Sequence, residues 1–205
     1  MLPGHSLLVK CPHCKGVKEL MTLVSGNTFG GRQWWDLKTE YPMLPHVSWV
    51  QRCPHCGNYY MYLTAKSREG DGYSGERGEL TYEQMRQAWA QLKDVTKKQH
   101  KNNLMLEYVW AYNDEFQRGG WADECPTPEE LEEFRAVVRE LVSVFPVESP
   151  MVHAEFLREA GLFQEAMEIV EKEEDKAQGI YKTLAGIIRE KCAQNDTSVG
   201  RIERQ

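Results

Sequence analysis

Long apolar runs are missing from this 205-residue sequence. No stretch approaches the roughly 20 consecutive apolar residues that a membrane-spanning helix needs. The first residues, 1–5, also lack the positive cluster and apolar stretch of a secretion signal. These absences predict a chain without membrane segments and, by default, a cytoplasmic location.

Catalytic signatures are missing as well. The sequence contains no nucleophile elbow, no phosphate-binding glycine loop and no HExxH motif. We therefore expect a protein that is not an enzyme, with no catalytic residues and no organic cofactor.

A dense basic stripe, which is typical of nucleic-acid-binding modules, is also missing. The net charge is −6. Residues 1–67 carry seven Lys and Arg against three Asp and Glu, whereas residues 68–205 carry eighteen against twenty-eight. The N-terminal excess of positive charge is too small to predict a nucleic-acid-binding surface by itself.

What the sequence does have is a duplicated cysteine motif. Four of the six cysteines lie in two identical CPHC tetrapeptides, residues 11–14 and 53–56, which 38 residues separate. In a cytosolic chain such spacing indicates a metal site more often than disulfides. A proline presets each turn, and we expect Gly16 and Gly57 to supply the positive φ that the turns need. The predicted ligands of one structural Zn²⁺ are Cys11, Cys14, Cys53 and Cys56.

The same four sulfurs allow a different occupant, and neighbouring histidines offer alternative ligands. Iron fits the same four sulfurs, and a thioredoxin-like redox motif would need a strand–helix junction that neither tetrapeptide predicts. His13 and His55 could serve as alternate ligands. Because four thiolates already fill a tetrahedral shell, we expect these two histidines to be surface imidazoles.

The chain around these motifs predicts an α+β protein. Residues 1–66 form a small β-rich domain, residues 67–79 are glycine-rich and acidic and predict a linker, residues 80–194 predict an all-α domain, and residues 195–205 predict a polar tail. Thr81 with Gln84, Thr127 with Pro128, and Ser149 with Pro150 mark helix starts. The apolar stripe of the first helix comprises Tyr82, Met85, Ala88, Trp89, Leu92 and Val95.

Two resemblances follow from these motifs. Residues 5–66, with their paired CxxC turns, resemble the zinc-ribbon or rubredoxin-knuckle class. Gly161, Phe163, Glu165 and Ala166 resemble the turn of one tetratricopeptide helical hairpin, of which no second copy is visible. The combination resembles bacterial families of unknown function, which implies a fold and a compartment but no activity.

The partner is less defined. We expect a zinc-binding adaptor or scaffold that contacts another protein, with an unknown oligomeric state. The alternative is a nucleic-acid-binding protein in which exposed tryptophans assist a set of basic residues, namely Lys10, Lys15, Lys18, Arg32, Lys38 and Arg52. If Trp34 or Trp35 is exposed, it could stack on a base in this alternative. We favour a packing role for both, because a small domain has little core of its own and needs large side chains to fill it.

Overall fold

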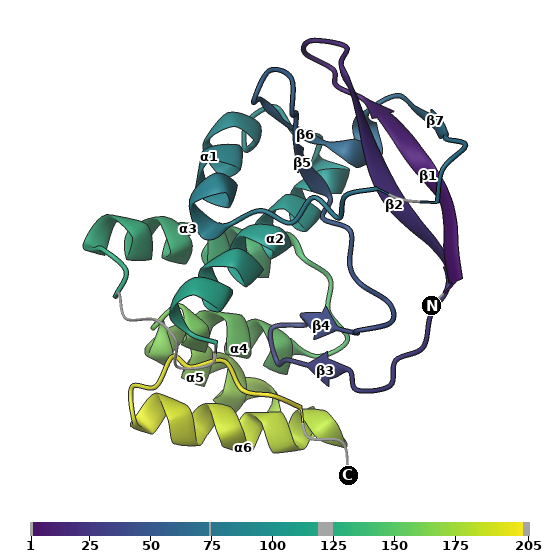
Figure 1. Cartoon of the computed structure of the whole chain (residues 1–205). Coiled ribbons are helices and arrows are strands. Elements are labelled where there is room, and N and C mark those ends of the chain that lie inside the picture. Colours follow the sequence, from purple (N-terminus) through teal and green to yellow (C-terminus); the bar gives the residue numbers. More distant parts are fainter. Residues whose placement is uncertain (1, 74, 119–124, 203–205) are drawn as a thin grey trace. The chain divides into compact units, whose positions relative to one another are not determined.

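The structure, a computed structural model, describes residues 2–73, 75–118 and 125–202. Short antiparallel strands occupy its N-terminal part, and six α-helices follow them in the described residues (Figure 1). The predicted α+β organisation is therefore confirmed. None of the helices in these ranges combines the length and the apolar character needed to cross a lipid bilayer.

Within the described ranges, the N-terminal strands form three small sheets. β1 (Leu2–Lys10) lies between β2 (Val17–Ser25) and β7 (Ser67–Glu69), and both pairings are antiparallel (Figure 1). β3 (Arg32–Gln33) pairs with β4 (Thr39–Glu40), and β5 (Val50–Arg52) pairs with β6 (Tyr59–Met61). The 3₁₀ turn η1 (Tyr62–Thr64) follows β6.

The segment 67–79 is not the free linker that its composition predicts. Its first residues are strand β7, and the Gly70 N–H donates to the Ser6 carbonyl at 2.8 Å. A Cβ on Gly70 would lie 2.4 Å from Ser6 Oγ, and one on Gly75 would lie 2.4 Å from the Leu20 backbone. The glycines that suggested flexibility instead allow close backbone approach, and backbone hydrogen bonds need no apolar side chains.

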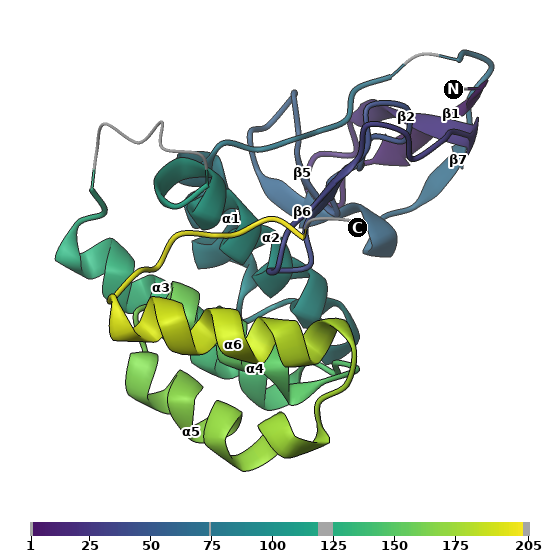
Figure 2. The ribbon, with the colours of Figure 1, turned by 90° about the horizontal axis from the view of Figure 1, so that it is seen from below.

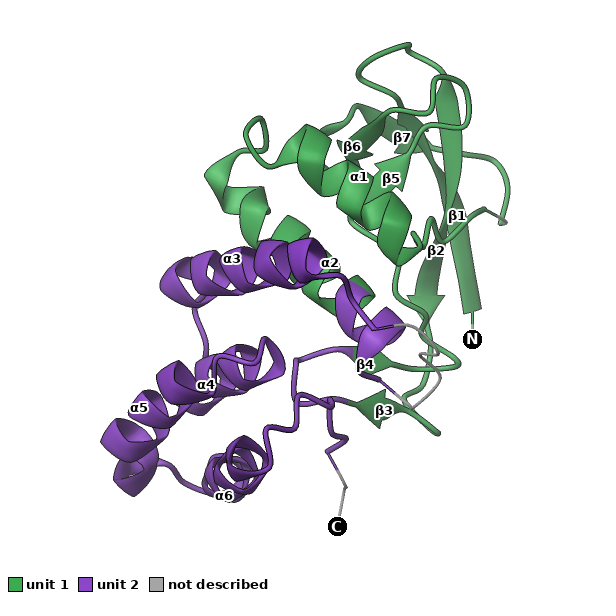
Figure 3. Cartoon of the chain, turned by 90° about the vertical axis from the view of Figure 1, so that its left-hand side faces the viewer, with its two compact units in different colours: residues 1–33, 39–111 green, residues 34–38, 112–205 purple. Residues whose placement is uncertain are grey.

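The chain divides into two compact units, and the division does not fall at residues 67–79 (Figure 3). Unit 1 contains residues 1–33 and 39–111, and unit 2 contains residues 34–38 and 112–205. Helix α2 (Lys98–Phe116) contributes to both units. Unit 1 is thus larger than the predicted N-terminal domain, because it also contains α1 and most of α2.

Helix α1 (Tyr82–Leu92) has the predicted capping box, in which Thr81 and Gln84 bond to each other's backbone N–H groups. The predicted apolar stripe is buried except for Val95, which lies beyond the end of the helix and is exposed. The stripe packs on β6, where the Tyr59 hydroxyl donates to Gln87 at 3.0 Å. The helix therefore supports the strand that follows the second CPHC.

The described part of unit 2 contains four more helices, and each of the predicted starts is present. Thr127 caps α3 (Pro128–Val144), and Ser149 caps α4 (Pro150–Glu159). Gly161, at a φ of 68°, separates α4 from α5 (Phe163–Glu173), which continues into the 3₁₀ turn η2 (Glu174–Lys176). Helices α4, α5 and α6 (Ile180–Ala193) pack against one another (Figure 2).

The region predicted as a polar tail is partly ordered by contacts within unit 2. Val199 is buried, and its N–H donates to the Gln117 carbonyl at 3.2 Å. The Trp35 N–H donates to Gly200 at 3.2 Å. Trp34 and Trp35 are both buried in this unit, as a packing role requires. The last residues of the predicted tail, 203–205, lie outside the described residues.

Candidate metal centre

Four cysteine sulfurs converge in unit 1. Cys11 and Cys14 lie between β1 and β2, whereas Cys53 and Cys56 lie between β5 and β6. All four sulfurs lie within 4.8 Å of one another. The Sγ atoms of Cys11 and Cys56 are 3.8 Å apart, and those of Cys14 and Cys53 are 3.6 Å apart. The two halves of the predicted ligand set thus meet across 38 intervening residues.

These distances suit a shared metal ion better than a disulfide. A zinc–thiolate bond is about 2.3 Å long, so the sulfurs of a regular tetrahedron are about 3.8 Å apart. A disulfide requires about 2.0 Å between its sulfurs. All six cysteines are free thiols in the structure. The cluster can therefore bind one metal ion with little movement of its ligands.

The two tetrapeptides fold into the same turn. The first cysteine donates its N–H to the carbonyl five residues later, Cys11 to Gly16 at 2.8 Å and Cys53 to Asn58 at 2.9 Å. Its own carbonyl accepts an N–H from the residue four positions later, at 3.0 Å in the first turn and 2.9 Å in the second. The sequence repeat is therefore also a structural repeat, as expected from its identical residues.

The glycines play unequal roles in these turns. Gly57 has the expected positive φ, at 75°, but in the first turn the equivalent residue is Lys15, at 68°. Gly16 is needed for a different reason, because a Cβ there would lie 2.2 Å from Cδ2 of His55. The prediction for Gly57 is confirmed, whereas the prediction for Gly16 is wrong in its cause.

The two histidines bond across the centre. His13 Nε2 lies 3.3 Å from the Tyr59 carbonyl, and His55 Nε2 lies 3.1 Å from the Val17 carbonyl. A carbonyl only accepts, so each imidazole donates. Each acceptor lies three residues after the last cysteine of the opposite turn, so the contacts are related by the repeat. These imidazoles tie one turn to the other, a role that sequence reasoning missed.

One side of the cluster faces a small apolar core. Cys11 and Cys53 are buried with Val9, Leu20 and Tyr60, whereas the other two cysteines are exposed. Burial, followed by the nearby cysteines, raises the pKa of Tyr60. Two of the four candidate ligands are therefore part of the packing of unit 1, so metal binding at this cluster would be coupled to folding.

The crowded sulfurs also differ in acidity. The Asn58 backbone N–H lowers the pKa of Cys56 to about 6. The Gly16 N–H lowers the pKa of Cys14, but partial desolvation and the hydrogen bonds of the neighbouring cysteines outweigh it and raise that pKa to about 12. Four adjacent thiolates repel one another, and a bound divalent cation removes this obstacle to ionising all four.

A buried carboxylate anchors the chain that leads into the second turn. Glu107 of α2, which is 7% exposed, accepts hydrogen bonds from the backbone N–H groups of Trp49 at 2.5 Å and Val50 at 3.4 Å. It also accepts from the Ser48 hydroxyl and from His46 Nε2, the latter at 3.1 Å. Nothing in the local sequence distinguishes this glutamate, because its donors are nearly 60 residues away.

The basic residues proposed for nucleic-acid binding do not form one free set. Lys18 is 8% exposed, pairs with Glu76 at 3.2 Å and donates to the Arg52 carbonyl at 3.4 Å. Lys38 belongs to unit 2, where it pairs with Asp114. The other four, Lys10, Lys15, Arg32 and Arg52, are exposed in unit 1.

Comparison of the chain with protein-family models, with curated proteins and with solved structures gave no match.

Proposed function

We propose that unit 1 holds one structural zinc ion through Cys11, Cys14, Cys53 and Cys56. The observation that carries this proposal is the convergence of the four sulfurs within 4.8 Å. Four thiolates complete the tetrahedral shell that zinc prefers, so no position remains for a catalytic water. The ion would stabilise unit 1 and leave the protein without a metal-based activity.

Metal content tests this first step. Purified chain, analysed by inductively coupled plasma mass spectrometry, should contain one zinc per chain and essentially no iron. A Cys14→Ser chain should lose that zinc, whereas Cys125→Ser should retain it, because Cys125 is exposed and outside the cluster. Fully folded protein without metal would overturn the proposal. Bound iron with a thiolate charge-transfer spectrum would instead identify the site as a rubredoxin-like iron centre.

We further infer that the chain is a cytoplasmic adaptor that binds another protein. A reducing compartment keeps the four thiols available to a metal. The absence of catalytic motifs in the sequence and the closed sulfur set both favour a binding role over catalysis. Two of the six candidate basic residues are already paired with carboxylates, which weighs against the nucleic-acid alternative.

Binding measurements separate these alternatives. The full chain should bind neither RNA nor DNA at low salt, and affinity capture from the native cell should recover the same protein partner with and without nuclease. Nucleic-acid affinity that falls steeply with salt would instead support the alternative, since neutralised phosphates release counterions. A partner lost after nuclease treatment would point the same way.

A further inference from the structure

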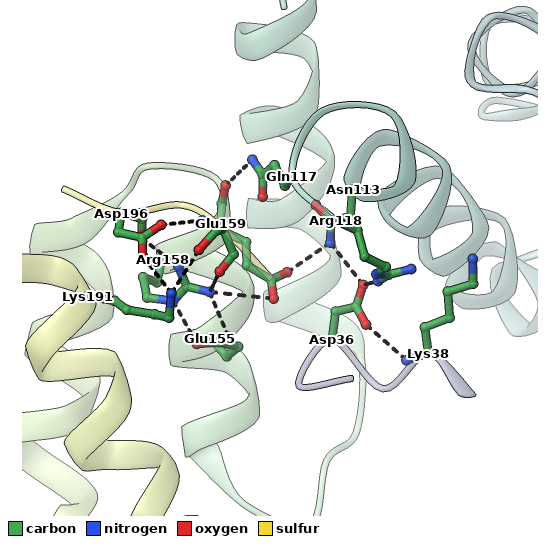
Figure 4. A network of polar contacts seen from close by, with 11 residues as sticks. Asp36, Lys38, Asn113, Gln117, Arg118, Glu155, Arg158, Glu159, Lys191 and Asp196 are labelled. Carbon is green, nitrogen blue, oxygen red and sulfur yellow. Dashed lines mark hydrogen bonds and ion pairs between the residues drawn. The ribbon is translucent and has the colours of Figure 1, made fainter. Parts of the chain in front are cut away.

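Unit 2 contains a buried cluster of charged side chains that the metal centre does not use (Figure 4). Its carboxyl groups lie in the loop 34–38, in α2, in α4 and in the segment after α6. Its cations lie in the same loop, just after the end of α2, in α4 and in α6. Asp36, Asn113, Glu155, Arg158 and Glu159 are each fully buried. Burying a charge is costly unless a partner offsets it, so the pairing of each group matters.

Four of the five carboxyl groups in the cluster form a close ion pair with a cation. Arg118 pairs with Asp36 and with Asp114, and Lys38 also pairs with Asp114. Glu155 receives two hydrogen bonds from Arg158, at 2.7 and 2.8 Å. Asp196 pairs with Lys191 at 2.6 Å. Five carboxyl groups thus share four cations, and Glu159 is the remaining one.

The contacts of Glu159 offer little compensation for a buried negative charge. Its Oε2 accepts from the Asn113 amide at 3.0 Å, and the same amide nitrogen donates to Asp36 at 3.0 Å. Its Oε1 makes no hydrogen bond within the described structure. Among the described residues the nearest cation, Arg158, is 3.8 Å away and already bonded to Glu155. Two carboxyl groups on one amide disfavour ionisation of both.

We propose that Glu159 is protonated in the folded protein and acts as the pH-sensitive group of a latch, which fastens the loop 34–38 and the segment 196–201 to the helices of unit 2. The assignment rests on the cation count and on the hydrogen bonds of Glu159. It does not depend on the metal centre of unit 1.

Several contacts connect the cluster to these two segments. Arg158 donates to the carbonyls of Asp196 at 2.6 Å and Ser198 at 3.1 Å. The guanidinium of Arg118 lies 4.7 Å from the centre of the Trp34 ring, on which Arg201 also lies, at 5.0 Å. A third negative charge, on Glu159 beside Asp36 and Glu155, would disturb the two arginines that make these contacts.

Electrostatics supports the same assignment. Burial, and then the carboxylates of Asp36 and Glu155, raise the pKa of Glu159 well above its usual value, against the opposing effects of Arg158 and Arg118. Burial also raises the pKa of Asp36, but Arg118, Asn113 and the Lys38 N–H oppose that shift. Three other groups border the cluster. Arg135 of α3 bonds to the Ala160 carbonyl and to Glu132, and the thiol of Cys192 is buried near Arg158.

The sign of the pH effect follows from linkage. Glu159 has a higher pKa in the folded than in the unfolded chain, so the folded protein binds more protons above the ordinary glutamate pKa of about 4.3. The contribution of Glu159 to stability is therefore fully present below the ordinary glutamate pKa and is lost as pH rises toward the pKa of Glu159 in the folded protein. In that interval the unfolding equilibrium constant should increase by up to tenfold per pH unit.

The experiment compares full-length wild type with three isosteric variants, Glu159→Gln, Asp36→Asn and Glu155→Gln, by urea unfolding from pH 6 to pH 9. Glutamine imitates the protonated acid, so Glu159→Gln should fold. Its unfolding free energy should lack the decrease with rising pH that ionisation of Glu159 causes in wild type. Glu155→Gln should be less stable at every pH but retain that decrease. The metal centre contributes equally to all four proteins and cancels in the comparison.

A direct measurement covers the case in which a variant does not fold. In wild type labelled with ¹³C at glutamate Cδ, one buried carboxyl resonance should remain that of the protonated acid at pH 7. Ionisation of every glutamate by that pH would overturn the proposal. The proposal would also be overturned if the unfolding free energies of wild type and Glu159→Gln depended equally on pH. Loss of that pH dependence in Asp36→Asn alone would overturn it as well.

Discussion

The sulfur cluster of unit 1 and the carboxylate–arginine cluster of unit 2 solve the same problem in different ways. Each gathers groups of like charge from distant segments into a partly or fully buried site. The sulfur cluster has no cation among its own members, and in our proposal zinc supplies one. The second cluster contains its cations within the chain and, by our inference, neutralises the last carboxyl group with a proton. The first site should therefore depend on a metal and the second on pH.

Removing one sulfur is the strongest test of that difference. Cys14→Ser should abolish metal binding and unfold the strands of unit 1 around the sulfur cluster, because short strands joined by two metal-binding turns obtain much of their folding free energy from a structural metal. The same unfolding should follow a strong chelator. The unfolding would be measured by hydrogen exchange, as loss of protection of the backbone amides in β1, β2, β5 and β6.

The matched control is Cys125→Ser, which removes an exposed thiol outside the cluster and should change nothing. Helices α3 to α6 should remain protected in Cys14→Ser, since their buried residues belong to unit 2. Complete loss of helical circular dichroism would contradict this separation and would mean that the two units fold only together.

Removing one buried cation from unit 2 should have the next largest effect. Arg158→Met leaves Glu155 buried without its ion pair, which typically costs roughly 3–5 kcal/mol. Chemical denaturation should show this loss, and zinc content should not change. Arg139→Met is the control, because Arg139 forms an exposed pair with Glu165, which contributes little to stability. Equal effects of the two substitutions would remove the distinction between the buried and exposed networks.

A third substitution tests whether the stability and zinc retention of unit 1 also depend on a buried carboxylate, Glu107. Glu107→Gln keeps the shape but replaces one acceptor oxygen by a donor NH₂, which faces the N–H groups of Trp49 and Val50. Loss of such charge-assisted bonds should cost about 1–3 kcal/mol and weaken zinc retention in a chelator competition. Glu168→Gln, on the exposed face of α5, is the control. Unchanged zinc retention would mean that Glu107 does not position the second CPHC.

The two clusters also differ in how far the sequence reveals them. The CPHC repeat predicts the ligand set because both halves of each turn lie within a few residues, and the helix caps are visible for the same reason. Glu107 and Glu159 carry no such signal, because their partners lie on elements far away in sequence. The segment 67–79 misled the prediction, since its glycines and charges suggest a flexible linker, but its backbone completes a sheet.

The smallest expected effect concerns the histidine contacts, and it decides whether these residues support the sulfur centre or belong to it. His55→Ala removes one donor to the Val17 carbonyl, and we expect metal affinity to fall about threefold to tenfold, as for the loss of a single hydrogen bond. A loss as severe as that of Cys14→Ser would mean that His55 is a ligand. His13→Ala should match His55→Ala in its effect on metal affinity, because the two contacts are related by the repeat.

Gly16→Ala tests the close packing of Gly16 against His55, since the added Cβ would clash with the His55 ring in wild type. It should be destabilising alone but nearly neutral in the His55→Ala background, and such non-additivity is expected only of residues in contact.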